Sequence, residues 1–134
     1  MRAMREQLQN RLRSLLVMEL FDSLLDDETL VRRPETALPA VLARHGELRV
    51  RSILDVGCGL GLMRRQLLRS FPRARYTGLE FSEYLCRRYG WEQGSAADFD
   101  PGRTYDLVVC YDVLQYLDAR AAAAAIRNLG RLCA

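Results

Sequence analysis

The sequence contains no lysine, since all 20 of its Lys and Arg residues are arginine. This absence excludes a Schiff base and a phosphate loop that ends in Gly-Lys-Ser or Gly-Lys-Thr. The arginines are spread along the chain rather than gathered in one run, and the net charge is only +3. We therefore expect no nucleic-acid partner.

The sequence also lacks closely spaced cysteines and long apolar runs. The four cysteines, Cys58, Cys86, Cys110 and Cys133, lie at least 23 residues apart. This spacing excludes a zinc ribbon and a redox Cys-x-x-Cys pair, so we expect reduced thiols and no metal site. No apolar run approaches the roughly 18 residues of a membrane span, and the N-terminus lacks a secretory signal. We expect a cytoplasmic protein without a membrane partner.

The first part of the sequence predicts helices. Leucines recur at three- and four-residue steps over residues 1–25, which predicts one amphipathic helix. It is either a packing helix, a lid over a substrate pocket or a dimer surface. A second helix over 35–45 is expected to stop at Gly46 as its left-handed C′ residue. The only histidine, His45, is better placed to complement the helix dipole than to catalyse. Residues 1–46 are thus an expected N-terminal helical extension.

Residues 47–134 alternate strands with helices. We expect strands at 50–56, 75–79, 91–94 and 105–111, and helices at 62–71, 83–89 and 119–132. Ser82 and Asp118 are expected N-caps, and Gly90 is an expected C-terminal stop. Such alternation predicts an α/β fold with a doubly wound parallel sheet of about four strands.

A turn with three alternate glycines, Gly57, Gly59 and Gly61, follows the first expected strand directly. Glycine lets a ligand approach the main chain, and the helix that follows favours an anionic group. Glu80 ends the second strand, 23 residues after Gly57, where a carboxylate can accept both hydrogen bonds of a ribose diol. The dinucleotide fingerprint requires glycine where this chain has Leu62, so NAD(P) is a less favoured alternative ligand.

Four motifs in order resemble the class I S-adenosylmethionine-dependent methyltransferase family. They are Ile53–Gly61, Gly78–Ser82, Gln93–Asp98 and Tyr105–Leu117. The resemblance covers residues 50–134 and implies a Rossmann-like domain over 47–134. It also implies S-adenosyl-L-methionine as the cofactor and methyl transfer to a small-molecule or unknown acceptor.

The resemblance implies a set of cofactor-binding residues. They are Asp55, Gly57, Cys58, Gly59, Glu80, Phe81, Ser95, Ala96, Cys110 and Tyr111. The loop glycines would lie under the methionine part of the cofactor, with Asp55 anchoring the turn and reaching the ammonium group. Glu80 would bind the ribose hydroxyls.

The remaining residues of this set would surround the adenine and the sulfonium. Phe81 would lie against the adenine face, or else be a core residue. Ser95 and Ala96 would approach the adenine edge, although the family commonly has Asp where this chain has Ser95. Cys110 and Tyr111 would pass beside the sulfonium, with a half-buried packing role as the alternative for Cys110.

The family sheet usually has seven strands, and this sequence stops at Ala134, where a fifth strand should begin. We therefore expect a truncated domain that lacks the later strands, with a complete minimal domain as the alternative. The fourth strand would then be an edge that pairs with a homodimer or partner chain, or is covered by the N-terminal helix. The alternative function is a non-catalytic cofactor-binding module that needs a partner or the missing half. Tyr111, Asp112 and Tyr116 are candidate bases, and none is assigned as catalytic.

Overall fold

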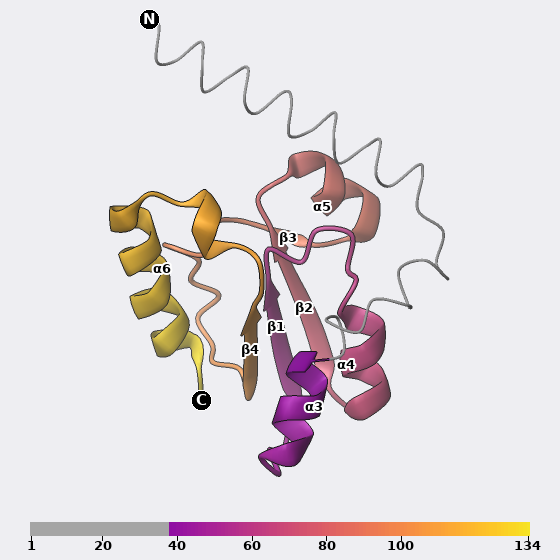
Figure 1. Cartoon of the computed structure of the whole chain (residues 1–134). Coiled ribbons are helices and arrows are strands. Elements are labelled where there is room, and N and C mark those ends of the chain that lie inside the picture. Colours follow the sequence, from indigo (N-terminus) through magenta and orange to yellow (C-terminus); the bar gives the residue numbers. More distant parts are fainter. Residues whose placement is uncertain (1–37) are drawn as a thin grey trace, which may run out of the picture. The chain divides into compact units, whose positions relative to one another are not determined.

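The computed structural model describes residues 38–134, so the helix expected over 1–25 lies outside the described residues. The elements follow in chain order (Figure 1). They are α3 (Leu38–His45), β1 (Ser52–Val56), α4 (Arg64–Ser70), β2 (Arg75–Glu80), α5 (Glu83–Tyr89), β3 (Glu92–Gln93), β4 (Leu107–Cys110), a 3₁₀ turn at Leu114–Tyr116, and α6 (Ala119–Leu132).

The strands form one parallel sheet in the order β3-β2-β1-β4. Asp55 on the central strand β1 pairs with Gly78 on β2 and with Val109 on β4. The chain runs outward from β1 to β3 and then crosses to the opposite side of β1, where β4 lies. The strand order therefore reverses between β1 and β4, which confirms the predicted doubly wound topology. In such sheets ligands bind at the carboxyl ends of the strands beside the reversal, so we expect the ligand crevice there.

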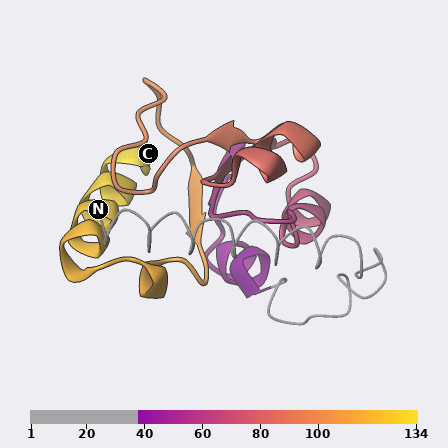
Figure 2. The same cartoon turned by 90° about the horizontal axis from the view of Figure 1, so that it is seen from above.

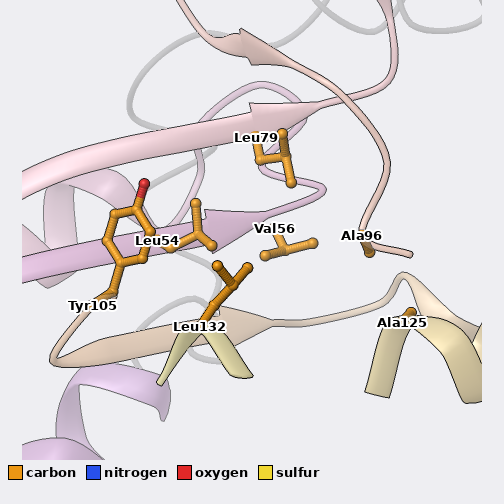
Figure 3. Close-up of a cluster of buried hydrophobic side chains, with 7 residues drawn as sticks. All are labelled: Leu54, Val56, Leu79, Ala96, Tyr105, Ala125 and Leu132. Atoms are coloured by element: carbon orange, nitrogen blue, oxygen red, sulfur yellow. The ribbon is translucent and has the colours of Figure 1, made fainter. Parts of the chain in front are cut away.

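Helices cover both faces of the sheet because successive side chains of a strand point to opposite faces. Leu54 and Val56 join a core cluster with Leu132 at the end of α6, as Figure 3 shows. Ile53 points to the other face, where it packs with Leu67 of α4 and with α3. Figure 2 shows the strands lying between α6 and α4.

Helix α3 belongs to the same compact unit as the sheet. Ala40 is buried in the cluster that contains Ile53, and the described residues 38–134 lie within one compact unit. Helix α3 ends at His45, as expected, and the N–H of Gly46 still donates to the Leu42 carbonyl. The left-handed residue is Glu47 (φ 54°) rather than Gly46, so the prediction that Gly46 is the left-handed C′ residue was wrong.

Local signals placed the other helix ends well. The Ser82 hydroxyl accepts from the Leu85 N–H, the Asp118 carboxylate accepts from the Ala121 N–H, and Gly90 is left-handed. Helix α4 begins two residues later than expected, because two consecutive turns come first: the Gly61 N–H donates to the Cys58 carbonyl, and the Arg64 N–H donates to the Gly61 carbonyl.

Strands β1 and β4 are shorter than expected because Asp106 occupies the donors near their starts. One of its carboxylate oxygens accepts from the backbone N–H groups of Arg51 and Ser52 and from the Ser52 hydroxyl. At the start of the two strands, these bonds take the place of backbone hydrogen bonds between β1 and β4. Regular pairing of β1 with β4 therefore begins only with Ile53 opposite Leu107.

The start of β4 meets the end of the described chain. The Tyr105 N–H donates to the Leu132 carbonyl at 2.8 Å, and the Ala134 N–H donates to the Tyr105 carbonyl at 2.9 Å. Together they form an isolated parallel bridge between Tyr105 and Cys133. Among residues 38–134, no strand pairs with the outer edge of β4 beyond this bridge.

Within the described range, no helix is long and apolar enough to span a bilayer. The same residues contain no cluster of three or more His, Cys, Asp or Glu side chains that could hold a metal ion.

Candidate functional site

The glycine turn after β1 lies at the end of the sheet where the ligand crevice is expected. Gly57, Gly59 and Gly61 all have positive φ, at 67°, 52° and 75°. The N–H groups of Gly57 and Cys58 both donate to the Leu79 carbonyl on β2, at 2.7 and 3.2 Å. The Cys58 side chain is buried and Gly57 is exposed, so the loop presents main chain rather than side chain to solvent at Gly57.

Gly57 is also where the β1 and β4 sides of the crevice touch. A Cβ atom at Gly57 would lie only 2.3 Å from Cγ2 of Val113, which follows β4. Glycine is therefore required here both by its backbone conformation and by the space that Val113 occupies.

Glu80 at the end of β2 is held by backbone donors. Its Oε2 accepts from the Gly59 N–H at 2.9 Å, and its Oε1 accepts from the N–H groups of Phe81 and Ser82 at 2.8 and 2.9 Å. A carboxylate has about four acceptor positions, so about one remains, on Oε2. The side chain is thus fixed against the glycine loop.

Asp55 is a buried carboxylate beneath the loop, with 4% of its surface exposed. Burial raises its pKa to about 6, the Tyr76 hydroxyl that donates to it at 2.7 Å lowers the pKa, and the charge of Glu80 raises it. The expected anchoring of the turn by Asp55 takes another form: this side chain is bonded to Tyr76, while Leu79 and Glu80 hold the turn.

Two aromatic residues that no sequence motif indicated, Tyr76 and Trp91, support the loop. Tyr76 lies opposite Ile53 in the parallel register, which places it on the same face as Asp55, two residues further along β1. Trp91, between α5 and β3, donates its indole N–H to the Gly59 carbonyl at 2.9 Å. Neither contact has a local sequence signal, because each depends on how distant segments are aligned.

The three residues expected near the adenine differ in their exposure. Phe81 is 56% exposed, so the alternative of a core residue is wrong, and the ring lies at the surface next to Glu80. Ala96 is buried in the core cluster, and its carbonyl accepts from the Asn128 side chain at 3.1 Å. Ser95 is half-buried, and its hydroxyl accepts from the Ala97 N–H. The Ala96 side chain therefore does not face the crevice.

The end of β4 closes the other side of the crevice. Cys110 pairs with Val56 of β1 and packs against the core cluster, as its alternative packing role predicts. Burial and then the charge of Asp55 raise the pKa of its thiol, so Asp55 lies within electrostatic range. Tyr111 is exposed, and Asp112 adopts a left-handed backbone with φ 59°. The structure thus brings Asp55, the glycine loop, Glu80 and Cys110 to one edge of the sheet.

A separate groove of about 520 Å³ lies on the outer side of the loop, lined by residues that include Arg64, Arg69 and Trp91. Neither Asp55 nor Glu80 lines it, so it is distinct from the crevice.

Residues 54–134, more than half of the chain, match the family of methyltransferase domains. The chain therefore belongs to this family, as the four ordered motifs predict. Its parallel sheet has the Rossmann-like fold of S-adenosylmethionine-dependent methyltransferases.

Two similar proteins illustrate the relationship. The malonyl-[acyl-carrier protein] O-methyltransferase of Halalkalibacterium halodurans is 30% identical over 82 residues, which cover 51% of this chain and 30% of that protein. The ubiquinone biosynthesis O-methyltransferase of Bordetella parapertussis is 30% identical over 104 residues, 64% of this chain and 42% of that protein. The chain thus spans less than half of the length of these curated relatives.

Solved structures with the same fold include two sugar-modifying enzymes. The S-adenosylmethionine-bound amino pentose methyltransferase CalS10 of Micromonospora echinaspora has a TM-score of 0.65 and 27% identity, covering 75% of this chain and 45% of that chain. The sugar N-methyltransferase KedS8 of a Streptoalloteichus species has a TM-score of 0.58 and 28% identity, covering 77% and 46%.

Proposed function

We propose that the chain binds S-adenosylmethionine in the crevice at the carboxyl ends of β1, β2 and β4 and transfers its methyl group to a small-molecule acceptor. The observation that carries this proposal is the 2.9 Å bond between the Gly59 N–H and Glu80 Oε2. It joins the glycine loop and the acidic residue, the two features that the family uses for this cofactor, in one rigid unit.

The residues present fit this cofactor. The Gly57 backbone is exposed, and no side chain could be added there without striking Val113. Glu80 retains about one acceptor position for a ribose hydroxyl. The second hydroxyl requires that one of the three backbone N–H bonds to Glu80 be exchanged. Asp55, with a pKa of about 6, is mainly ionised at pH 7 and can attract the ammonium group of the methionine part.

The cofactor, when bound, supplies a methyl group on a positively charged sulfur that is a good leaving group. The protein mainly holds the reactants in line and excludes water, an effect that is worth up to ~7–11 kcal/mol. A general base is needed only if the acceptor must lose a proton. Asp112 lies near the end of β4, where its carboxylate accepts a bond from the Gln115 side chain. Asp112, Tyr111 and Tyr116 all stay candidates, and we assign none of them as the catalytic base.

A second function has support from the outer edge of β4. The bridge between Tyr105 and Cys133 begins a parallel pairing that no strand continues within the described residues. Exposed strand edges recruit other strands. The alternative is therefore a cofactor-binding module in which a partner chain, a second copy or a C-terminal half pairs with β4 before turnover occurs. A methyl-release assay of this chain, alone and with a longer chain, distinguishes the two functions: turnover by the chain alone excludes the module.

We also propose a cytoplasmic location, because all four cysteines are free thiols.

Titration with S-adenosylhomocysteine by calorimetry tests cofactor binding. We expect Glu80→Ala to weaken binding about 100-fold or more, because hydrogen bonds to a charged acceptor contribute ~1.5–3 kcal/mol each. Glu80→Gln should retain part of the affinity, since its amide oxygen still accepts. Glu83→Ala is the matched control, because Glu83 is exposed and pairs with Arg87 rather than with the loop. Absence of wild-type binding at millimolar ligand contradicts the proposal, as does equal binding by Glu80→Ala.

A further inference from the structure

Trp91 packs directly beneath the glycine loop. Its indole N–H donates to the Gly59 carbonyl at 2.9 Å, across a separation of 32 residues. A Cβ atom at Gly61 would lie 2.9 Å from the indole ring, and one at Gly78 on β2 would lie 2.7 Å from it. The ring thus fills the space between the loop and β2, and both glycines are needed to admit it.

The indole is itself held from three elements. The rings of Tyr76 on β2 and Tyr89 at the end of α5 each lie 5.7 Å from it, centroid to centroid. The Arg64 guanidinium of α4 lies 5.9 Å from the Trp91 ring and 5.8 Å from the Tyr76 ring. Aromatic pairs and cation–π contacts at these distances are attractive. The indole therefore has a defined position before any ligand binds.

Gly59 is consequently fixed on both sides of its α-carbon. Its N–H donates to Glu80 Oε2, and its carbonyl accepts from Trp91. We infer that Trp91 is a positioning residue of the crevice: by holding the Gly59 carbonyl, it keeps the Gly59 N–H on the carboxylate that receives the ribose. The identity of the ligand rests on the proposed function, whereas the hold on the loop needs no ligand.

The first test uses the ligand-free protein. Trp91→Phe keeps an aromatic ring but removes the N–H donor, so the loop should open more often. We expect the backbone amides of Gly59 and Gly61 to exchange with deuterium about five- to tenfold faster, the effect of one lost hydrogen bond. Amides of α6 serve as the internal reference, because a general loss of stability would accelerate them too. Unchanged loop exchange in the folded variant overturns the inference, whether or not any ligand binds.

The second test measures ligand affinity. By calorimetry, Trp91→Phe should bind S-adenosylhomocysteine about five- to tenfold more weakly than the wild type. Tyr105→Phe is the control, because Tyr105 lies before β4, at the opposite end of the sheet, and should retain wild-type affinity. Equal affinity of Trp91→Phe and the wild type overturns the inference. If the wild type binds no ligand, the proposed function fails while the exchange test still decides the role of Trp91.

A second variant covers the case in which Trp91→Phe does not fold. Tyr89→Leu removes the stacked ring and leaves the indole N–H, so we expect a smaller, about two- to threefold, increase in exchange at Gly59 and Gly61. No increase contradicts the inference.

Discussion

The two sides of the crevice are built differently. On the β2 side, Glu80 accepts three backbone N–H groups, and Gly59 is bonded through both its N–H and its carbonyl. On the β4 side, Tyr111 and Tyr116 are exposed, with 78% of Tyr116 accessible, and the Asp112 carboxylate accepts a hydrogen bond from the nearby Gln115 side chain. The side that would hold the cofactor is preformed, and the side that would meet the acceptor is open.

This difference has a physical reason. A rigid site loses little conformational freedom on binding, so preorganised groups give affinity for one constant ligand. Loops at strand ends can vary without disturbing the core, so acceptor specificity can change there while the cofactor side stays the same. The two sides meet at Gly57 and Val113, and substitutions there should disturb both at once.

The largest effect is expected for Gly57→Ala. The left-handed backbone at φ 67° costs an alanine ~1–2 kcal/mol, and a Cβ atom 2.3 Å from Val113 adds overpacking of ~1–3 kcal/mol. We expect a loss of about 3 to 4 kcal/mol in the free energy of unfolding, measured by urea denaturation.

Gly102→Ala provides the matched control for this prediction. Gly102 has the same φ of 67°, and a Cβ atom there would meet nothing within 4 Å. It should lose only the backbone contribution, ~1–2 kcal/mol. Adding Val113→Ala to Gly57→Ala should recover part of the stability. Equal losses at Gly57 and Gly102 would show that the two sides of the crevice do not press on each other.

The next effect concerns pH and the buried Asp55. Its pKa of about 6 lies above the ordinary value of 3.8, so the folded state binds the proton more tightly than the unfolded state does. Stability should therefore fall as pH rises from about 4 to 6, by up to about 3 kcal/mol at 1.36 kcal/mol per pH unit. Chemical denaturation across this range should show a flatter profile for Asp55→Asn than for the wild type.

Ligand affinity should change in the opposite direction over the same pH range. An ionised Asp55 attracts the ammonium group of the methionine part, so binding of S-adenosylhomocysteine should strengthen as pH rises through 6. Tyr76→Phe removes the donor that favours the ionised Asp55 carboxylate. The loss of stability and the gain in ligand affinity should therefore both occur at higher pH than in the wild type. If stability and ligand affinity depend on pH in the same way in the wild type and in Asp55→Asn, the raised pKa of Asp55 is contradicted.

The sequence predicted what depends on local chemistry. The N-caps Ser82 and Asp118 and the stop at Gly90 were confirmed because each involves bonds within a few residues. The alternation of strands and helices was enough to predict the doubly wound parallel sheet.

The sequence could not predict contacts that depend on register and on distant packing. Tyr76 reaches Asp55 only because β1 and β2 align Tyr76 with Ile53. Trp91 reaches Gly59 across the end of the sheet, and Ala96 turns into the core because Asn128 of α6 binds its carbonyl. No spacing along the chain encodes these pairings.

The smallest effect is expected for Asp112→Gly, which tests whether the open β4 side contributes to the crevice. Asp112 and Glu47 are the two non-glycine residues of the described part with positive φ, at 59° and 54°. Glycine removes this strain at some entropic cost, so each substitution should raise the free energy of unfolding by ~0.5–1 kcal/mol in thermal or urea denaturation.

The two substitutions should differ in their effect on binding. The left-handed turn at Asp112 directs the next residue, Val113, onto Gly57, whereas Glu47 lies in the connection between α3 and the start of β1. We therefore expect Asp112→Gly to weaken S-adenosylhomocysteine binding about two- to fivefold and Glu47→Gly to leave it unchanged. If both variants gain stability and neither loses affinity, the strain at Asp112 is a local feature of the turn, and the β4 side does not shape the cofactor crevice through it.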